Sequence, residues 1–208
     1  MPPAVDLPAP PVPDGPVRRL PIAGHTLALS WSPEFCRSRR ADPAQALQCG
    51  GRLGRFGFIL HGLWPEGRGR QWPQWCPVRR MPDAATLRRH LCMTPSPALL
   101  THEWAKHGSC MTASPQAYFA RADALYARVR YPDMTALARR PGLDAGAVRA
   151  AFTRANPWLT PEAIRLLLGR DGALREVHLC LSRRFTPTRC PAANAGPGDQ
   201  TPVRVTPP

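Results

Sequence analysis

Seven cysteines in a chain of 208 residues are the feature that most limits what this sequence can fold into. They are not arranged as Cys-x-x-Cys pairs, so their spacing does not favour a zinc site. So many cysteines are unusual in a reducing compartment, and we interpret them as disulfides formed in an oxidising one. Because seven is an odd number, at least one thiol stays unpaired or forms an intermolecular bond.

The ends of the sequence bear on where such a protein works. No apolar run reaches 18 residues, so we expect no membrane span. The N-terminus also lacks a basic segment followed by an apolar one, which is the pattern of an export signal. We expect that the signal has been removed and that the protein is periplasmic or secreted. A start assigned too far downstream is the alternative.

Proline marks the boundaries of the folded unit. Residues 1–21 hold eight prolines and little apolar periodicity, which predicts an extended, poorly ordered arm. The tail at residues 191–208 has a similar composition. The segment between them, residues 22–190, contains no internal repeat and has the length of one domain.

Within that domain, strand and helix patterns follow one another without a regular alternation. Three segments show the apolar alternation or the short buried run of a strand: His25–Trp31, Phe56–His61 and Leu174–Leu181. Four segments have helical patterns: Ser96–Lys106, Pro115–Val129 after Ser114, Ala145–Ala155, and Pro161–Leu168 after Thr160. This order predicts an α+β fold with a central antiparallel sheet and several packed helices.

The formal net charge of +14 indicates what kind of partner the chain attracts. So strong an excess concentrates polyanions, such as nucleic acid or an anionic membrane surface, although it also serves plain solubility. Of the 28 basic residues, only Lys106 is a lysine, and it lies in one of the two segments described next.

The first segment that carries chemistry is Phe58–Pro65, F-I-L-H-G-L-W-P. It places His61 at the end of a predicted buried strand, directly before Gly62. A rigid strand end can hold the imidazole steady while its edge meets solvent. This segment predicts a histidine positioned for catalysis.

The second segment is Thr101–Cys110, T-H-E-W-A-K-H-G-S-C, near the end of a predicted helix. Around the helix axis, His102, Lys106, Glu103 and His107 fall at about 0°, 40°, 100° and 140°. They share one flank, whereas Trp104 points the opposite way and can anchor the helix in the core. Two imidazoles, a carboxylate and an ammonium on one flank indicate a functional site.

Other interpretations compete with this one. Histidines are most often structural or simply exposed, and we expect each of His25, His90 and His178 to be one or the other. The helix also has some likeness to the His-Glu-x-x-His motif of zinc proteases. Here the two histidines are five residues apart, so they diverge by about 140° and cannot chelate one ion as that motif does.

Taken together, the two segments resemble the paired active-site segments of the ribonuclease T2 family of secreted and periplasmic acid ribonucleases. Upstream, Trp31–Cys36 is similar to the first strand and turn of that family, and His178–Ser182 is similar to one of its last strands. The resemblance covers about residues 25–190 and leaves both Pro-rich ends outside. It implies a ribonuclease T2-like α+β fold.

The resemblance also implies a reaction. The chain is then an endoribonuclease that cleaves single-stranded RNA through a 2′,3′-cyclic phosphate, with no metal and no cofactor. By similarity, His107 is the general base and His61 the general acid, although the reverse assignment stays open. Glu103 and Lys106 stabilise charge on the phosphorane, and His102 binds the phosphate.

The remaining implications concern base recognition and the cysteines. Trp64 and Trp72 resemble an aromatic platform for the base, which implies low base specificity because every base can stack. The implied disulfides leave Cys92 unpaired; they are Cys76–Cys110, Cys180–Cys190 and Cys36–Cys49. We expect a monomer whose partner is single-stranded RNA.

Two further functions stay open. A non-catalytic protein on the same scaffold could bind RNA or a charged surface through its arginines, but it has no need for an acid, a base and a charge stabiliser together. A secreted toxin directed at competitors would use the same ribonuclease mechanism.

Overall fold

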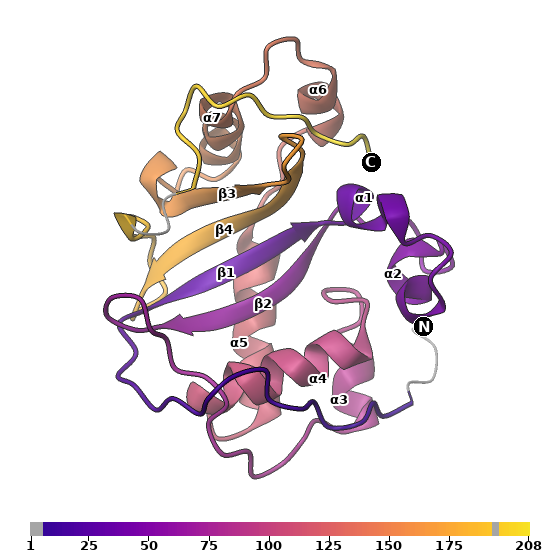
Figure 1. Cartoon of the computed structure of the whole chain (residues 1–208), viewed down its shortest axis with the longest axis vertical. Helices are drawn as coiled ribbons and strands as arrows, with labels where there is room; N and C mark the ends of the chain where they lie inside the picture. The colour runs from indigo at the N-terminus through magenta and orange to yellow at the C-terminus, as the bar shows by residue number, and fades with distance from the viewer. Residues whose placement is uncertain (1–5, 193–195) are drawn as a thin grey trace.

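The computed structural model describes residues 6–192 and 196–208. One antiparallel sheet has the strand order β2-β1-β4-β3 (Figure 1), with the strands β1 Gly24–Trp31, β2 Phe58–Glu66, β3 Ile164–Leu168 and β4 Leu174–Ser182. The helices of the described residues are α1 Ser32–Phe35, α2 Ala46–Cys49, α3 Ala84–Arg89, α4 Pro97–Lys106, α5 Pro115–Arg128, α6 Met134–Arg139 and α7 Ala145–Ala155. The predicted α+β fold with a central antiparallel sheet is confirmed.

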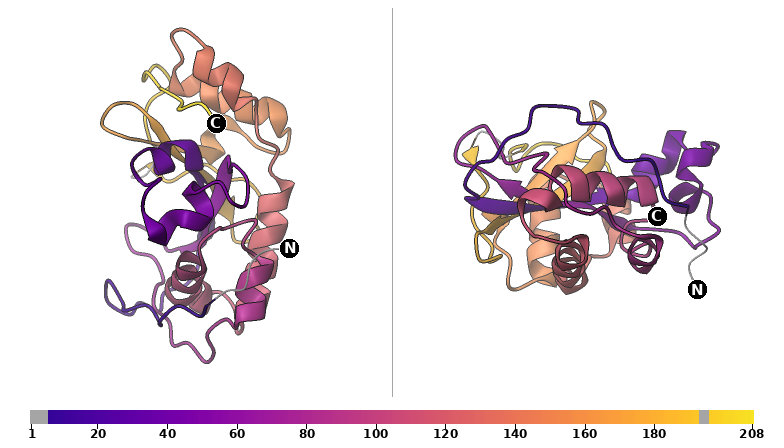
Figure 2. Two further views of the ribbon diagram at one scale, coloured as in Figure 1. Left: turned by 90° about the vertical axis from the view of Figure 1, so that its right-hand side faces the viewer. Right: turned by 90° about the horizontal axis from the view of Figure 1, so that it is seen from below.

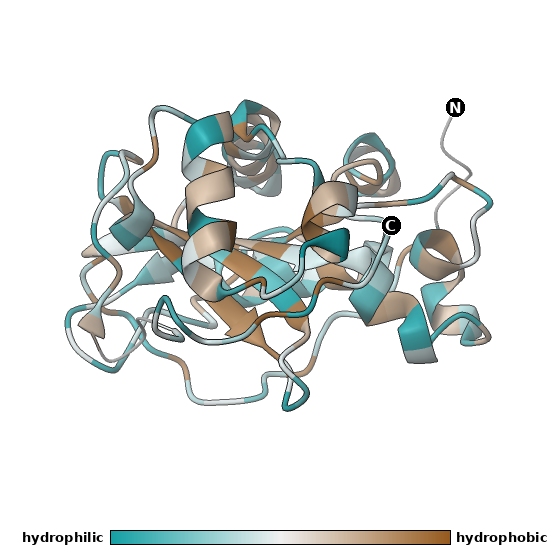
Figure 3. Cartoon of the chain, turned by 90° about the horizontal axis from the view of Figure 1, so that it is seen from above, coloured by the Kyte–Doolittle hydropathy of each residue, from teal (hydrophilic) through white to brown (hydrophobic). Residues whose placement is uncertain are grey.

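One face of the sheet forms the core. Apolar side chains alternate along each strand and meet in register across the sheet, among them Leu27, Leu29, Leu63, Val177 and Leu179. The long helix α5 passes behind the sheet (Figure 1) and buries Tyr118 and Phe119. Figure 3 shows the apolar residues concentrated in the strands and on the inner sides of the helices. The other face of the sheet is left for polar chemistry.

Local capping explains why the predicted helices form where they do. The Ser96 hydroxyl accepts a hydrogen bond from the Leu99 amide, 3.2 Å away, and Pro97 opens α4. Ser114 caps α5 in the same way. The helices predicted at Ser96–Lys106, Pro115–Val129 and Ala145–Ala155 are confirmed to within a residue at each end. Among the described residues, no helix is long and apolar enough to span a membrane.

The helix predicted at Pro161–Leu168 is wrong. The Thr160–Pro161 start signal produces one 3₁₀ turn at Pro161–Ala163, and β3 follows it. Ile164 and Leu166 are buried and alternate with partly exposed residues. Their backbone pairs with β4, and this pairing outweighs the local helical signal.

The strand predicted at Phe56–His61 is longer than expected and continues to Glu66. Leu29 of β1 faces Leu60, whereas the preceding residue, Ala28, faces Gly62. His61 is therefore the extra residue of a β-bulge. A bulge re-aims one side chain without ending the strand. The strand therefore does not end at His61 as predicted but continues through a bulge there.

The disulfides are those that the family resemblance implies. They join Cys36 to Cys49, Cys76 to Cys110, and Cys180 to Cys190. Cys92 is exposed and has no disulfide partner among the described residues.

Both Pro-rich ends contact the domain where the structure describes them. In the arm, Arg18 exchanges two backbone hydrogen bonds with Gln74, and the arm runs beside α4 (Figures 1 and 2). In the tail, Val203 and Val205 are buried, and the Arg204 carbonyl accepts a hydrogen bond from the Leu174 amide. The domain limits at residues 22 and 190 stay predictions.

Candidate active site

All seven residues predicted for the site line one pocket of about 390 Å³: His61, Trp64, Trp72, His102, Glu103, Lys106 and His107. Strand β2 supplies the first two, the loop after it supplies Trp72, and the end of α4 supplies the others. Arg165 of β3 reaches the same pocket. Two segments about 40 residues apart in sequence thus meet over the polar face of the sheet.

His61 projects from the β2 bulge with a third of its side chain exposed. Its Nδ1 lies 2.8 Å from Oε1 of Glu176, and its Nε2 lies 3.8 Å from Oε1 of Glu103. Burial disfavours the charged imidazolium, but the hydrogen bond that Nδ1 donates to Glu176 and the charges of Glu103 and Glu176 outweigh burial and raise the pKa of His61. This shift favours the protonated ring more than in a free imidazole.

Glu103 lies beneath this histidine and is almost fully buried. Its Oε2 accepts a hydrogen bond of 2.6 Å from Nε1 of Trp64. A β-carbon at Gly62 would overlap both of these atoms, so this position requires glycine. Burial raises the pKa of Glu103 to about 7, against the opposing effects of His61 and Trp64.

His107 caps the C-terminal end of α4 and is only 6% exposed. Among the described residues, its Nδ1 has no hydrogen-bond partner although it is buried. Its ring lies 5.5 Å from that of Trp64. Burial and the nearby charge of Lys106 lower the pKa of His107 to about 3, so its imidazole is neutral.

Lys106 and His102 lie on the side of α4 that faces the N-terminal arm. The ammonium of Lys106 is 2.6 Å from Oδ2 of Asp14, whose other oxygen accepts a hydrogen bond from Nε1 of Trp75. The edge of the His102 ring meets Trp75, with ring centres 5.4 Å apart. Burial and Lys106 lower the pKa of His102. An arm residue that the sequence did not single out thus contacts the predicted phosphate-binding lysine.

The two predicted base-binding tryptophans differ in their surroundings. The ring of Trp64 contacts three imidazoles, those of His61, His107 and His178. Trp72 is 39% exposed, and the guanidinium of Arg18 lies 5.1 Å from its ring centre. Trp72 therefore presents the more accessible ring.

Sequence reasoning missed Glu176 and predicted that His178 is structural or exposed; in the structure His178 is buried, at 2% exposure. On β4 they lie on the face opposite to Val177 and Leu179, and Glu176 contacts His61 of the pocket. Oε2 of Glu176 lies 2.6 Å from Nε2 of His178. The signal was present, because two ionisable residues alternate with the apolar ones.

His25 and His90 lie outside this pocket. His25 is buried in a stack with Phe185, and His90 is buried in a stack with Phe119. Their surroundings fit the structural role predicted for them.

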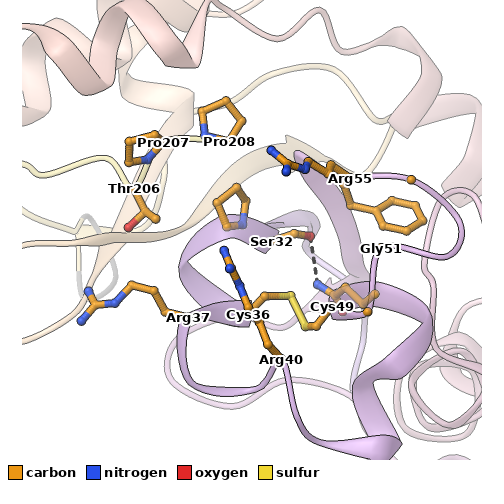
Figure 4. Close-up of a pocket in the computed structure, with 15 residues that line it drawn as sticks. Ser32, Cys36, Arg37, Arg40, Cys49, Gly51, Arg55, Thr206, Pro207 and Pro208 are labelled. Carbon is orange, nitrogen blue, oxygen red and sulfur yellow. Dashed lines mark hydrogen bonds between the residues drawn. A yellow bond between two sulfur atoms is a disulfide. The ribbon is translucent and has the colours of Figure 1, made fainter.

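Another cavity, of about 300 Å³, opens beside the Cys36–Cys49 disulfide (Figure 4). Arg37, Arg40 and Arg55 contribute to its wall, and no histidine or carboxylate residue is among the residues that line it. It has no acid–base pair and is not a candidate active site. Within the described ranges, no group of three or more His, Cys, Asp or Glu residues is arranged to hold a metal ion.

The pocket around His61 and His107 combines an imidazole that favours the charged form, one that favours the neutral form, a buried carboxyl group and a lysine. Such a set can remove one proton, deliver another and stabilise an anion between them. These are the elements of acid–base catalysis.

Comparison with known proteins gives the family. The ribonuclease T2 family profile matches residues 25–145. A ribonuclease from Aeromonas hydrophila is 34% identical over 167 residues, which are 78% of this chain and 73% of that protein. The chain belongs to the ribonuclease T2 family, and we class it as an RNA-cleaving enzyme.

Other relatives are consistent with this assignment. A probable ribonuclease from Haemophilus influenzae is 35% identical over 127 residues, which span 55% of this chain but only 46% of that protein. Among solved structures, an RNase-related protein from Calystegia sepium matches with a TM-score of 0.68 at 20% identity, over 88% of this chain and 97% of that one. RNase NT, solved in complex with 5′-AMP, matches with a TM-score of 0.65 at 21% identity, over 90% and 99% of the two chains. These structures share the fold.

Proposed function

We propose that this protein is an endoribonuclease that cleaves single-stranded RNA by transphosphorylation, without a metal ion. His107 accepts the proton of the 2′-hydroxyl as the 2′-oxygen attacks phosphorus. His61 donates a proton to the 5′-oxygen as its bond to phosphorus breaks. The products are a 2′,3′-cyclic phosphate and a free 5′-hydroxyl.

One observation carries the assignment of the two roles: the pKa of His61 is raised, whereas burial lowers that of His107 to about 3 in the same pocket. Where the surroundings of two titratable groups push their pKa values apart, the group with the higher pKa is assigned as the acid and the other as the base. Burial is the larger cause of that low pKa and Lys106 the next; the negative charge of a bound phosphate offsets that of Lys106 and so raises the pKa of His107.

The remaining residues stabilise the transition state and bind the substrate. Glu103, with a pKa of about 7, has a substantial protonated fraction near neutral pH and can donate a hydrogen bond to a phosphorane oxygen. Lys106 and His102 bind the phosphate. A base stacks on Trp72 or Trp64, and such stacking stabilises by roughly 1–3 kcal/mol with little sequence preference. Base specificity is therefore low.

The proposal extends to where the enzyme works. Three disulfides fit an oxidising compartment, either the periplasm or the exterior of the cell. We propose that it acts there as a monomer.

The test of this function is cleavage of single-stranded RNA after treatment with excess EDTA. We expect full activity on RNA and none on DNA of the same sequence, because DNA lacks the attacking 2′-hydroxyl. Activity that disappears with EDTA and returns with zinc would contradict the mechanism, as would cleavage of the DNA.

The contact between the arm and the site gives a second prediction. The carboxylate of Asp14 competes with phosphate for Lys106, so Asp14→Asn should tighten the binding of inorganic phosphate, measured as its inhibition constant. An exposed ion pair contributes about 0.2–1 kcal/mol, which corresponds to a gain of up to about fivefold. The amide keeps an oxygen that can accept from Trp75.

Asp6→Asn is the matched control, because Asp6 is exposed in the same arm. It removes the same charge, and we expect no change in the inhibition constant. Equal constants for the two variants would mean that Asp14 does not restrict the phosphate site.

A further inference from the structure

Four side chains in and beside the pocket form a hydrogen-bonded series that converges on the carboxylate of Glu176. Nη2 of Arg165 lies 2.6 Å from Nδ1 of His178. A guanidinium only donates, so Nδ1 of His178 accepts, and the proton of a neutral ring is on Nε2. That nitrogen donates to Oε2 of Glu176, 2.6 Å away.

The carboxylate of Glu176 completes the series. Hydrogen bonding to His178 and His61 lowers the pKa of Glu176 despite its burial, so it is ionised and only accepts. Its Oε1 lies 2.8 Å from Nδ1 of His61, which must donate. Because the ionised carboxylate accepts from both histidines, a proton lies on Nδ1 of His61.

We propose that Glu176 is a positioning residue for His61: its carboxylate holds the Nδ1–H and aims Nε2 into the pocket toward Glu103. This inference rests on the proposed function for its kinetic consequence. The proposed tautomer of the His61 ring does not depend on activity and can be measured separately.

The surroundings of His61 explain why such a group is needed. The ring sits on a β-bulge and is a third exposed, so its backbone alone does not fix its orientation. Glu176 contacts it from β4, and Glu103 faces it from α4. Lys106 on the same helix and His178 on β4 contribute positive or potentially positive charge nearby. The ring of Trp64 lies nearly perpendicular to the imidazole, with ring centres 5.1 Å apart.

In the reaction, the proton on Nε2 of His61 passes to the 5′-oxygen as the bond from that oxygen to phosphorus breaks. The Nδ1–H stays on the ring, bonded to Glu176. The neutral ring that remains is the Nδ1–H tautomer, with Nε2 free to accept a proton for the next turnover. Without Glu176 the ring is free to turn, and its imidazolium loses a neighbouring anion.

The first experiment measures the ring directly, by NMR titration of the ¹⁵N-labelled histidines. In the wild-type protein we expect neutral His61 to be the Nδ1–H tautomer. In Glu176→Gln we expect its pKa to fall by about one unit or more, because an opposite charge within hydrogen-bond distance has been removed. An Nε2–H tautomer in the wild type would overturn the proposal even if the variant does not fold.

The second experiment compares leaving groups. With RNA, Glu176→Gln should lower kcat by about 10–100-fold, a part of the 10²–10⁴-fold that a general acid contributes, with little change in KM. The alkaline limb of the pH profile should move to lower pH, since His61 must be protonated and its pKa has fallen. With uridine 3′-(4-nitrophenyl phosphate), whose leaving group needs no protonation, the defect should nearly vanish.

Glu162→Gln is the matched control, since it makes the same change at an exposed carboxylate outside the pocket. It should leave both the pH profile and the His61 titration unchanged. An equal loss on both substrates, or an unshifted His61 pKa in Glu176→Gln, would overturn the proposal. A wild-type protein that does not cleave RNA would overturn the proposed function, and the His61 titration would still decide the role of Glu176.

Discussion

Replacing His61 or His107 by alanine lowers kcat/KM for single-stranded RNA by about 10²–10⁴-fold each, because each variant lacks one of the two proton transfers. The double variant should be far less impaired than the product of the two single losses, since the acid and the base act in one concerted reaction. The measurement is initial-rate kinetics on a defined oligonucleotide, with circular dichroism to verify the fold.

His25→Asn is the control for these variants, because His25 is buried against Phe185 and lies outside the pocket. A folded His25→Asn protein should retain its activity. A His61→Ala or His107→Ala protein with near-normal rates would remove that residue from the proposed mechanism.

Removing the Cys76–Cys110 disulfide, as Cys76→Ser with Cys110→Ser, should abolish activity at lower urea concentrations than those that unfold the helices. This bond closes a loop of 34 residues and stabilises the fold by roughly 3–4 kcal/mol on the chain-entropy argument. Cys110 lies three residues after His107, and the amide of Trp75 donates to the Lys106 carbonyl, 2.8 Å away. Both links tie the end of α4 to the loop that follows β2.

The measurement follows activity and ellipticity in parallel along a urea titration. The double variant at Cys36 and Cys49 is the matched control, because it opens a 13-residue loop whose cysteines are not among the residues that line the active pocket. It should lose activity and ellipticity together. Cys92→Ser should change neither, since Cys92 is exposed and has no disulfide partner among the described residues. If the variant at Cys76 and Cys110 lost activity and ellipticity at the same urea concentration, the special role of this bond would be contradicted.

The sequence predicts an element well when local interactions decide it. Helix α4 begins at a serine cap followed by proline, and both signals lie within its first turn. The site residues of α4 follow from helical spacing once that start is known. The family resemblance accounts for the three disulfides, which spacing alone leaves open.

Prediction fails where contacts distant in sequence decide the structure. The Thr160–Pro161 pair is a valid helix start, yet β4 captures the following residues as a strand. The alternation along β4 places Glu176 on the polar face, but its contact with His61 follows only when β4 is aligned beside β1 and His61 is recognised as a bulge. Asp14 lies 92 residues from Lys106, in an arm whose composition predicts an extended, poorly ordered segment. Each of these depends on register or docking, which local propensity does not encode.

The most direct test of the central claim is the identity of the ends produced from a dinucleoside phosphate in excess EDTA, read by mass spectrometry. We predict a 2′,3′-cyclic phosphate on one product and a 5′-hydroxyl on the other, and no reaction when the attacking 2′-hydroxyl is replaced by hydrogen. Products with a 5′-phosphate, or cleavage of the 2′-deoxy analogue, would contradict attack by the 2′-hydroxyl.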